Sequence, residues 1–180
     1  MAGQPAAYVG AWSLMMTAMM LPSVLPLVLL YGRAARPREQ ALLAAAYIAV
    51  WSATGLLAYA ADMHVGVPAA AVLLVAAAYE VTPLKRACLR RCRTPVDFLI
   101  VRWRRGSLGA LRLGLEHGLY CAGCCWALMA VLVLAASMSL AWAAMLAAVL
   151  FVQKVLPAPR WSSAATAAGL LVAAALTEVL

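Results

Sequence analysis

The chain has 180 residues, of which 67% are hydrophobic and 11% are charged. Soluble domains are about 45–50% hydrophobic and about 25% charged, so this composition excludes a soluble domain and also a disordered chain. Its 14 Lys and Arg residues against 6 Asp and Glu give a formal net charge of +8. Because the basic residues are confined to short stretches between long apolar runs, they do not indicate nucleic-acid binding. The composition predicts an integral membrane protein whose helices lie in a lipid bilayer.

Six apolar segments give the predicted architecture. A helix needs about 20 mostly apolar residues to cross the hydrocarbon core of a bilayer, and six segments of this chain reach or approach that length. We therefore expect one all-α domain over residues 1–180, a polytopic membrane helix bundle with six transmembrane helices. In chain order, these helices are expected at about residues 8–31, 41–61, 67–81, 108–136, 139–154 and 162–179.

The distribution of Lys and Arg predicts the orientation of the bundle. Basic residues follow the first, third and fifth apolar segments, and the last of these groups consists of Lys154 and Arg160. The loops on the opposite side contain no Lys or Arg. Because short basic loops stay in the cytoplasm, we expect a multi-pass protein with cytoplasmic basic loops and both termini outside.

The basic segment after the third apolar stretch contains a helical pattern of its own, at about residues 94–105. Thr94 and Pro95 suit the N-cap and the first helical position, and Gly106 can end the helix. One face carries apolar residues at helical spacing and the other carries arginines: Val96, Leu99, Ile100 and Trp103 against Arg102 and Arg105. This pattern predicts an amphipathic helix in the cytoplasmic interface, where it anchors the chain to anionic lipid.

The fourth apolar segment carries the residues most suited to chemistry. His117, Cys121 and Cys124 stand at positions i, i+4 and i+7 of one helical face, and Cys125 follows directly. Ionisable groups inside a membrane segment are costly and indicate function. Bare thiolates would be prohibitively unfavourable there, and a bound cation removes that cost. We therefore expect these four residues to bind a soft transition metal, Cu(I) rather than Zn(II). The alternative is that the cysteines pack as small apolar residues.

Methionines provide a second group of soft ligands. Four of them precede Pro22 in the first apolar segment, and a fifth lies one turn beyond Cys125: Met15, Met16, Met19, Met20 and Met129. Thioethers bind Cu(I) without losing a proton, so these residues form a candidate path for a soft metal. Methionine also fills gaps in ordinary cores, and this alternative stays open. Pro22 and Pro26 are expected to kink the first helix.

A further thiol pair and several charged residues border these groups. Cys88 and Cys92 are one helical turn apart among basic residues, which favours thiolates and hence a second metal or thiol site. The alternative is a pair of idle, reduced thiols. Glu80 is expected to pair with a basic residue nearby. Glu116 follows Arg112 by four residues, which predicts an ion pair along the helix or a role in orienting a metal ligand.

Three motifs occur in order along nearly the whole chain: MMTAMMLPS (residues 15–23), TPLKRACLRRCR (residues 82–93) and HGLYCAGCCW (residues 117–126). With these motifs the chain resembles a bacterial family described as predicted metal-binding integral membrane proteins, a domain of unknown function. The resemblance implies a metal-binding protein of the bacterial cytoplasmic (inner) membrane. Glu80 departs from the pattern, because we expect Gln at this position in the family.

Metal handling and thiol chemistry are the two leading functions that fit these features. The first is transport or delivery of a soft metal ion, with a membrane or metallochaperone protein as partner. No nucleotide-binding loop is present, which excludes ATP-driven pumping by this chain alone. The second is a membrane thiol-disulfide oxidoreductase built on the Cys121-Ala122-Gly123-Cys124 pair. Cys88 and Cys92 would then be its electron partner.

The third function is that of a structural or assembly subunit. Gly114, Gly118 and Gly123 in the fourth apolar segment allow close helix packing, which a partner helix could use. No Ser, His and Asp set and no facing pair of carboxylates is evident, so nothing indicates a hydrolase. An enzyme is therefore the less favoured class.

Overall fold

The computed structural model describes residues 4–64, 66–135, 139–155 and 161–179, and these residues form helices and no strand. In chain order the helices are α1 (Pro5–Gly32), α2 (Pro37–His64), α3 (Ala69–Glu80), α4 (Pro83–Arg93), α5 (Pro95–Arg102), α6 (Gly106–Ala130), α7 (Leu140–Val155) and α8 (Trp161–Val179). A π-helical segment, Val131–Ala135, continues α6. The structure therefore confirms the all-α class.

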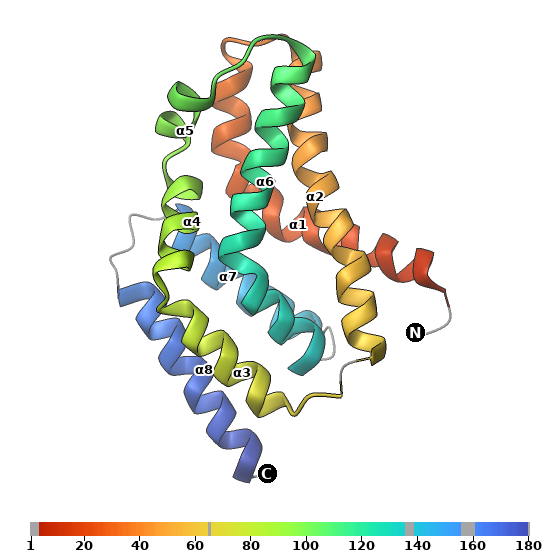
Figure 1. The fold of residues 1–180 in the computed structure, drawn as a ribbon, viewed down its shortest axis with the longest axis vertical. Helices are drawn as coiled ribbons and strands as arrows, with labels where there is room; N and C mark the ends of the chain where they lie inside the picture. Colours follow the sequence, from red (N-terminus) through yellow and green to blue (C-terminus); the bar gives the residue numbers. More distant parts are fainter. Residues whose placement is uncertain (1–3, 65, 136–138, 156–160, 180) are drawn as a thin grey trace.

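The helices are arranged around α6 (Figure 1). α2 packs against α6 on one side and against α1 on the other, while α4 packs against α6 and α7. α3 and α8 lie side by side at the end of the molecule that holds the C-terminus. α4 and α7 are distant from each other in the sequence. Both nevertheless contact α6, the helix that carries three of the five cysteines.

Proline and threonine define where several helices begin. Proline is the first residue of α1, α2, α4 and α5, a position where the backbone N–H would lack a helical partner in any case. Thr82 caps α4, because its side chain accepts a hydrogen bond from the Lys85 backbone N–H at 3.2 Å. Thr94 precedes α5 but does not cap it. Its hydroxyl instead donates to the Arg90 carbonyl, at 3.1 Å, and so closes the end of α4.

The basic segment differs from the sequence-based prediction. It forms two helices, and the helix expected at residues 94–105 spans only Pro95–Arg102 because the backbone is extended at Trp103. Gly106 does not end α5. It begins α6 with a φ of 79°, a left-handed conformation that favours glycine. Of the expected apolar face, Leu99 is buried while Val96 and Ile100 stay exposed.

The helix lengths divide the six predicted spans into two groups. Three helices are long and apolar enough to cross a membrane: Pro5–Gly32, Pro37–Met63 and Gly106–Leu134. The other three described apolar helices are shorter, namely Ala69–Glu80, Leu140–Val155 and Trp161–Thr177. Ala69–Glu80, with 12 residues, rises only about 18 Å, whereas the hydrocarbon core is about 30 Å thick.

Glycines bring α6 close to its neighbours within the chain itself. A Cβ added at Gly114 would lie 2.9 Å from the Cβ of Ala46 and would collide with the Leu43 carbonyl of α2. A Cβ at Gly118 would lie 2.9 Å from a methyl group of Val50. These glycines therefore serve the contact between α6 and α2, which accounts for them without a partner subunit.

The first helix bends as its prolines predict. α1 is continuous through Pro22 and Pro26, and Figure 1 shows that its two ends point in different directions. Proline removes a backbone donor from the helix interior. Ser23 donates its hydroxyl to the Met20 carbonyl at 2.8 Å, which satisfies one of the groups near the bend. Trp12 fixes the helix to α2 by donating to the Trp51 carbonyl at 2.9 Å.

Candidate metal centre

Four of the five cysteines gather in the interior, and we call them the thiol cluster: Cys92 of α4 with Cys121, Cys124 and Cys125 of α6. Each is at most 8% exposed. The Sγ atoms of Cys124 and Cys125 are 3.3 Å apart, and those of Cys92 and Cys124 are 3.9 Å apart. All the cysteines are free thiols. The structure thus assembles a buried group of soft donors from two helices.

Helical spacing and a missing side chain explain this assembly. Positions i, i+3 and i+4 place Cys121, Cys124 and Cys125 on one face of α6. Gly123 lets α4 come close, because a Cβ there would lie only 3.0 Å from the Cys88 Sγ. The Tyr79 hydroxyl donates to the Gly123 carbonyl at 2.5 Å and holds the end of α3 to the same turn of α6.

A lysine lies directly against the thiol cluster. Lys154 of α7 is 5% exposed, and its Nζ lies 2.9 Å from the Cys121 Sγ and 3.4 Å from the Met20 Sδ. The Tyr47 hydroxyl of α2 is also 2.9 Å from the Cys121 Sγ. An ammonium at this distance stabilises a negatively charged sulfur. The sequence-based prediction placed Lys154 at the end of the fifth helix, among the cytoplasmic basic residues, whereas in the structure its side chain is buried against Cys121.

His117 lies beside the cluster without a hydrogen bond at one of its nitrogens. Its ring packs against Phe98, with centroids 5.1 Å apart, and against Tyr47, at 5.9 Å. Its side chain is buried, and among the described residues nothing hydrogen-bonds its Nδ1. A cavity of about 100 Å³ is lined by His117, Cys92 and Lys154 together with residues of α1. His117 therefore faces a small space that the thiol cluster also borders.

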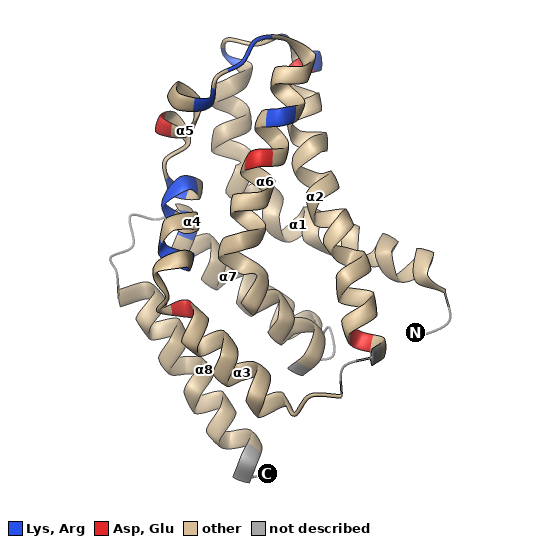
Figure 2. Ribbon diagram, viewed as in Figure 1, with Lys and Arg blue, Asp and Glu red and all other residues tan. Residues whose placement is uncertain are grey.

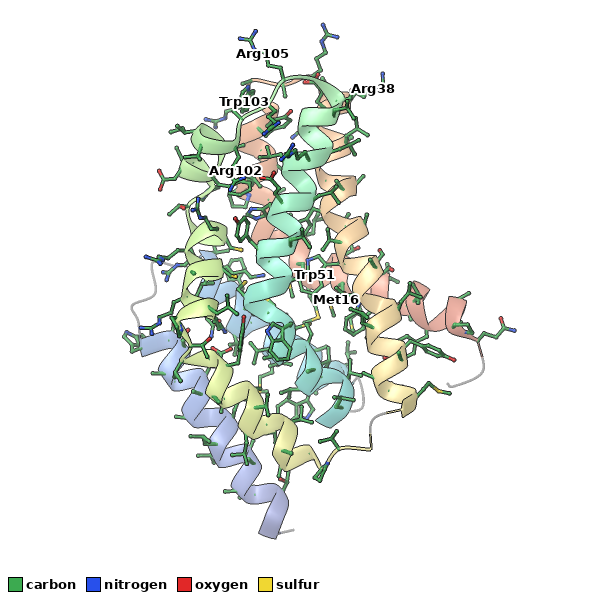
Figure 3. All side chains as sticks on the ribbon, viewed as in Figure 1. Met16, Arg38, Trp51, Arg102, Trp103 and Arg105 are labelled. Carbon is green, nitrogen blue, oxygen red and sulfur yellow. The ribbon has the colours of Figure 1, made fainter. Side chains whose placement is uncertain are left out.

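The five methionines predicted as a path for a soft metal differ in burial and in the part of the structure that they line. Met16 and Met20 are buried on one face of α1, and Met20 lies against Lys154. Figure 3 labels Met16 near Trp51, midway along the bundle. Met15 and Met19 are only half-buried. Met129 is buried and lines a separate apolar cavity of about 270 Å³, whose walls include Trp12, Trp51 and Trp126.

Cys88 and Cys92, the pair predicted as a second metal or thiol site, have different surroundings. Cys92 belongs to the thiol cluster, whereas Cys88 is half-buried against Gly123. Partial burial raises the pKa of the Cys88 thiol above its ordinary value. Desolvation thus opposes the thiolate that the neighbouring arginines were expected to favour, and the side chains of Arg86, Arg90 and Arg91 are exposed.

The charged residues near the site hold the framework together. Glu80 and Lys85 form an ion pair with no exposed surface. Gln153 donates to the Glu80 carboxylate at 3.1 Å and accepts from the Lys85 ammonium at 2.9 Å. At the surface, Glu116 pairs with Arg112 at 2.9 Å and with Arg102 at 3.2 Å. The carboxylates of Glu80 and Glu116 thus both pair with basic side chains.

The donor set fits some metals better than others. Within the described parts of the chain, no three His, Cys, Asp or Glu side chains stand in an arrangement that could hold a metal ion. Zn(II) in structural sites takes four ligands in a tetrahedron. Cu(I) favours sulfur and can be held by two thiolates. The neighbouring thiols of Cys124 and Cys125 supply such a pair without a third ligand.

The chain belongs to the PpoB2 family, described as copper chaperones, because the model of that family matches residues 9–177. This match supports the copper-related part of the family resemblance drawn from the sequence motifs. Comparisons with curated proteins and with solved structures found no match.

Proposed function

We propose that this member of the copper-chaperone family is an integral membrane carrier that holds Cu(I) on the thiol cluster and passes it to a protein partner. The observation that carries the proposal is the contact between buried thiols of α4 and α6, with the thioether of Met20 across Lys154 from Cys121. Soft donors in an apolar surrounding select Cu(I) over Mg(II) or Ca(II). Two-coordinate binding favours Cu(I) over Zn(II).

We propose that His117 binds the ion transiently as it reaches the thiol cluster through the adjoining cavity. Its unbonded Nδ1 can bind a soft cation, and the cavity borders both His117 and Cys92. Met16 and Met20 follow each other by one turn of α1 and extend the row of soft donors away from Cys121. An ion could therefore change partners by exchanging one sulfur or nitrogen at a time, which is the chemistry that delivery requires.

The proposed setting is a bacterial cytoplasmic membrane with six spans. The three long helices would cross the bilayer, and the shorter apolar helices α3, α7 and α8 would complete the bundle. Figure 2 shows Lys and Arg at the end where α5 meets α6 and along α4, away from the end where α2 finishes. By the distribution of positive charge, the first of these regions would face the cytoplasm, with both termini outside.

A copper titration tests this proposal. The full chain, purified in mild detergent under reducing conditions, would be titrated with Cu(I) in competition with a chromophoric Cu(I) chelator. We expect the wild type to bind Cu(I), and Cys124→Ser with Cys125→Ser to weaken binding by at least about tenfold, which is 1.4 kcal/mol. Cys88→Ser is the matched control and should leave the affinity unchanged, because Cys88 lies outside the cluster.

Three results would count against the proposal. Equal copper binding by the wild type and the double variant would exclude the cluster as the site. Loss of binding in Cys88→Ser alone would move the site to the surface of α4. A reversible disulfide between Cys121 and Cys124, detected by trapping free thiols with a mass-shifting reagent, would favour the oxidoreductase instead.

A further inference from the structure

Two sulfur atoms are the hydrogen-bond partners of the Lys154 ammonium among the described residues. Its Nζ contacts the sulfur atoms of Cys121 and Met20. The buried carboxylate of Glu80 is already paired with Lys85 and hydrogen-bonded to Gln153. No ion pair between Lys154 and an acid is present among the described residues. Any negative charge that compensates this ammonium must therefore come from the thiol cluster or from what it binds.

Buried charge is costly unless it is balanced locally. Two thiolates and one Cu(I) ion carry a net charge of −1, and the Lys154 ammonium brings the total to zero. Two thiolates and one divalent ion are already neutral, so the same ammonium leaves a net charge of +1 in the interior. The charge on Lys154 therefore favours the monovalent complex over the divalent complex on the same pair of sulfurs.

We infer that Lys154 is a selectivity residue, a fixed countercharge that makes the thiol cluster prefer Cu(I) over Zn(II). This inference rests on the proposed function, because it assigns a role at the same site. Lys154 is a positioning residue and does not itself bind the metal. A positive charge within a few ångströms of the bound ion, in an interior of low polarity, changes a binding constant by more than about tenfold.

The length and place of the side chain support this role. Lys154 lies in the last turn of α7, yet it is 5% exposed and points to the α6 thiols and not to the surface. Lysine side chains near helix ends normally extend toward water. Burial of this ammonium against Cys121 therefore has an energetic cost that a purely structural lysine could avoid by turning outward.

Charge-neutral and charge-retaining variants separate charge from size. Lys154→Met removes the charge and adds a thioether of similar length, which by ligand chemistry alone should improve Cu(I) binding. Lys154→Gln removes the charge without adding a soft ligand, and Lys154→Arg keeps the charge. Each full-length variant would be titrated separately with Cu(I) and with Zn(II), and its folding checked by circular dichroism and gel filtration in detergent.

We expect Lys154→Met and Lys154→Gln to lower the ratio of Cu(I) affinity to Zn(II) affinity by more than about tenfold. Lys154→Arg should keep the preference of the wild type. An unchanged or higher ratio of Cu(I) to Zn(II) affinity in both neutral variants would overturn the inference while leaving the proposed function intact. Tight Zn(II) binding by the wild type, through three thiolates, would also overturn it. A wild type that binds no Cu(I) would instead refute the proposed function.

Discussion

α2 and α6 approach each other closely at Gly114, so a larger side chain there should destabilise the protein. Gly114→Ala places a Cβ 2.9 Å from the Ala46 Cβ and 3.1 Å from the Leu43 carbonyl carbon. Carbon atoms prefer separations of about 3.5–4.0 Å, so the helices must move apart by roughly half an ångström or more. Overpacking of this kind costs about 1–3 kcal/mol.

A second glycine supplies the matched control. Gly169 lies within α8, and a Cβ there would meet nothing within 4 Å. Both Gly→Ala changes gain about 1 kcal/mol of helix propensity, so the difference between the two variants isolates the clash. We expect Gly169→Ala to be neutral or stabilising and Gly114→Ala to be less stable than Gly169→Ala by about 1–3 kcal/mol.

Thermal unfolding in mild detergent, followed by circular dichroism, measures this difference. Gly114→Ala should unfold several degrees below Gly169→Ala under identical conditions. It should also weaken copper binding, because the same contact places Tyr47 of α2 against Cys121 of α6. Equal melting temperatures for the two variants would refute the packing of α2 on α6 described above.

Three further predictions concern other parts of the molecule. Lys85→Met should destabilise the protein by about 3–5 kcal/mol, because it leaves the Glu80 carboxylate buried without its cation. The double variant Lys85→Met with Glu80→Gln should recover most of this loss in the same melting assay. Arg112→Gln should cost less than about 1 kcal/mol, since its pairing with Glu116 lies at the surface and Arg102 also pairs with Glu116; a larger loss would contradict this placement. Labelling of Cys88 by a thiol reagent should be slow at neutral pH and should accelerate only at a higher pH than for an exposed cysteine. The reason is that burial raises the pKa of Cys88 and the thiolate is the reactive form. Equal labelling rates in folded and denatured protein at neutral pH would contradict this prediction.

The sequence predicts the helices well because their signals are local. Apolar runs and the proline at residue 95 mark where helices begin to within a few residues, whereas the glycine at residue 106, expected to end a helix, begins one. Spans of membrane thickness are harder to predict, because apolar composition does not set helix length. The stretch at residues 67–81 shows this, since only Ala69–Glu80 is helical there.

The candidate site is predictable only along one helix. The spacing of Cys121, Cys124 and Cys125 predicts that they share a face of α6. The contact of Cys92 with Cys124 depends on how α4 packs against Gly123, and no local sequence pattern predicts this packing. Lys154 carries a signal in the sequence, because it ends an apolar helix and ionisable residues in such helices indicate function. The direction of its side chain, toward the thiols of α6, depends on how α7 packs.

X-ray absorption at the copper edge of the copper-loaded wild-type protein shows directly whether the thiol cluster holds the ion. We expect a Cu(I) edge with sulfur as the nearest scatterer and low coordination, and loss of that sulfur shell when Cys121, Cys124 and Cys125 are replaced by serine. A Cu(II) edge, or a first shell made of nitrogen and oxygen alone, would contradict it.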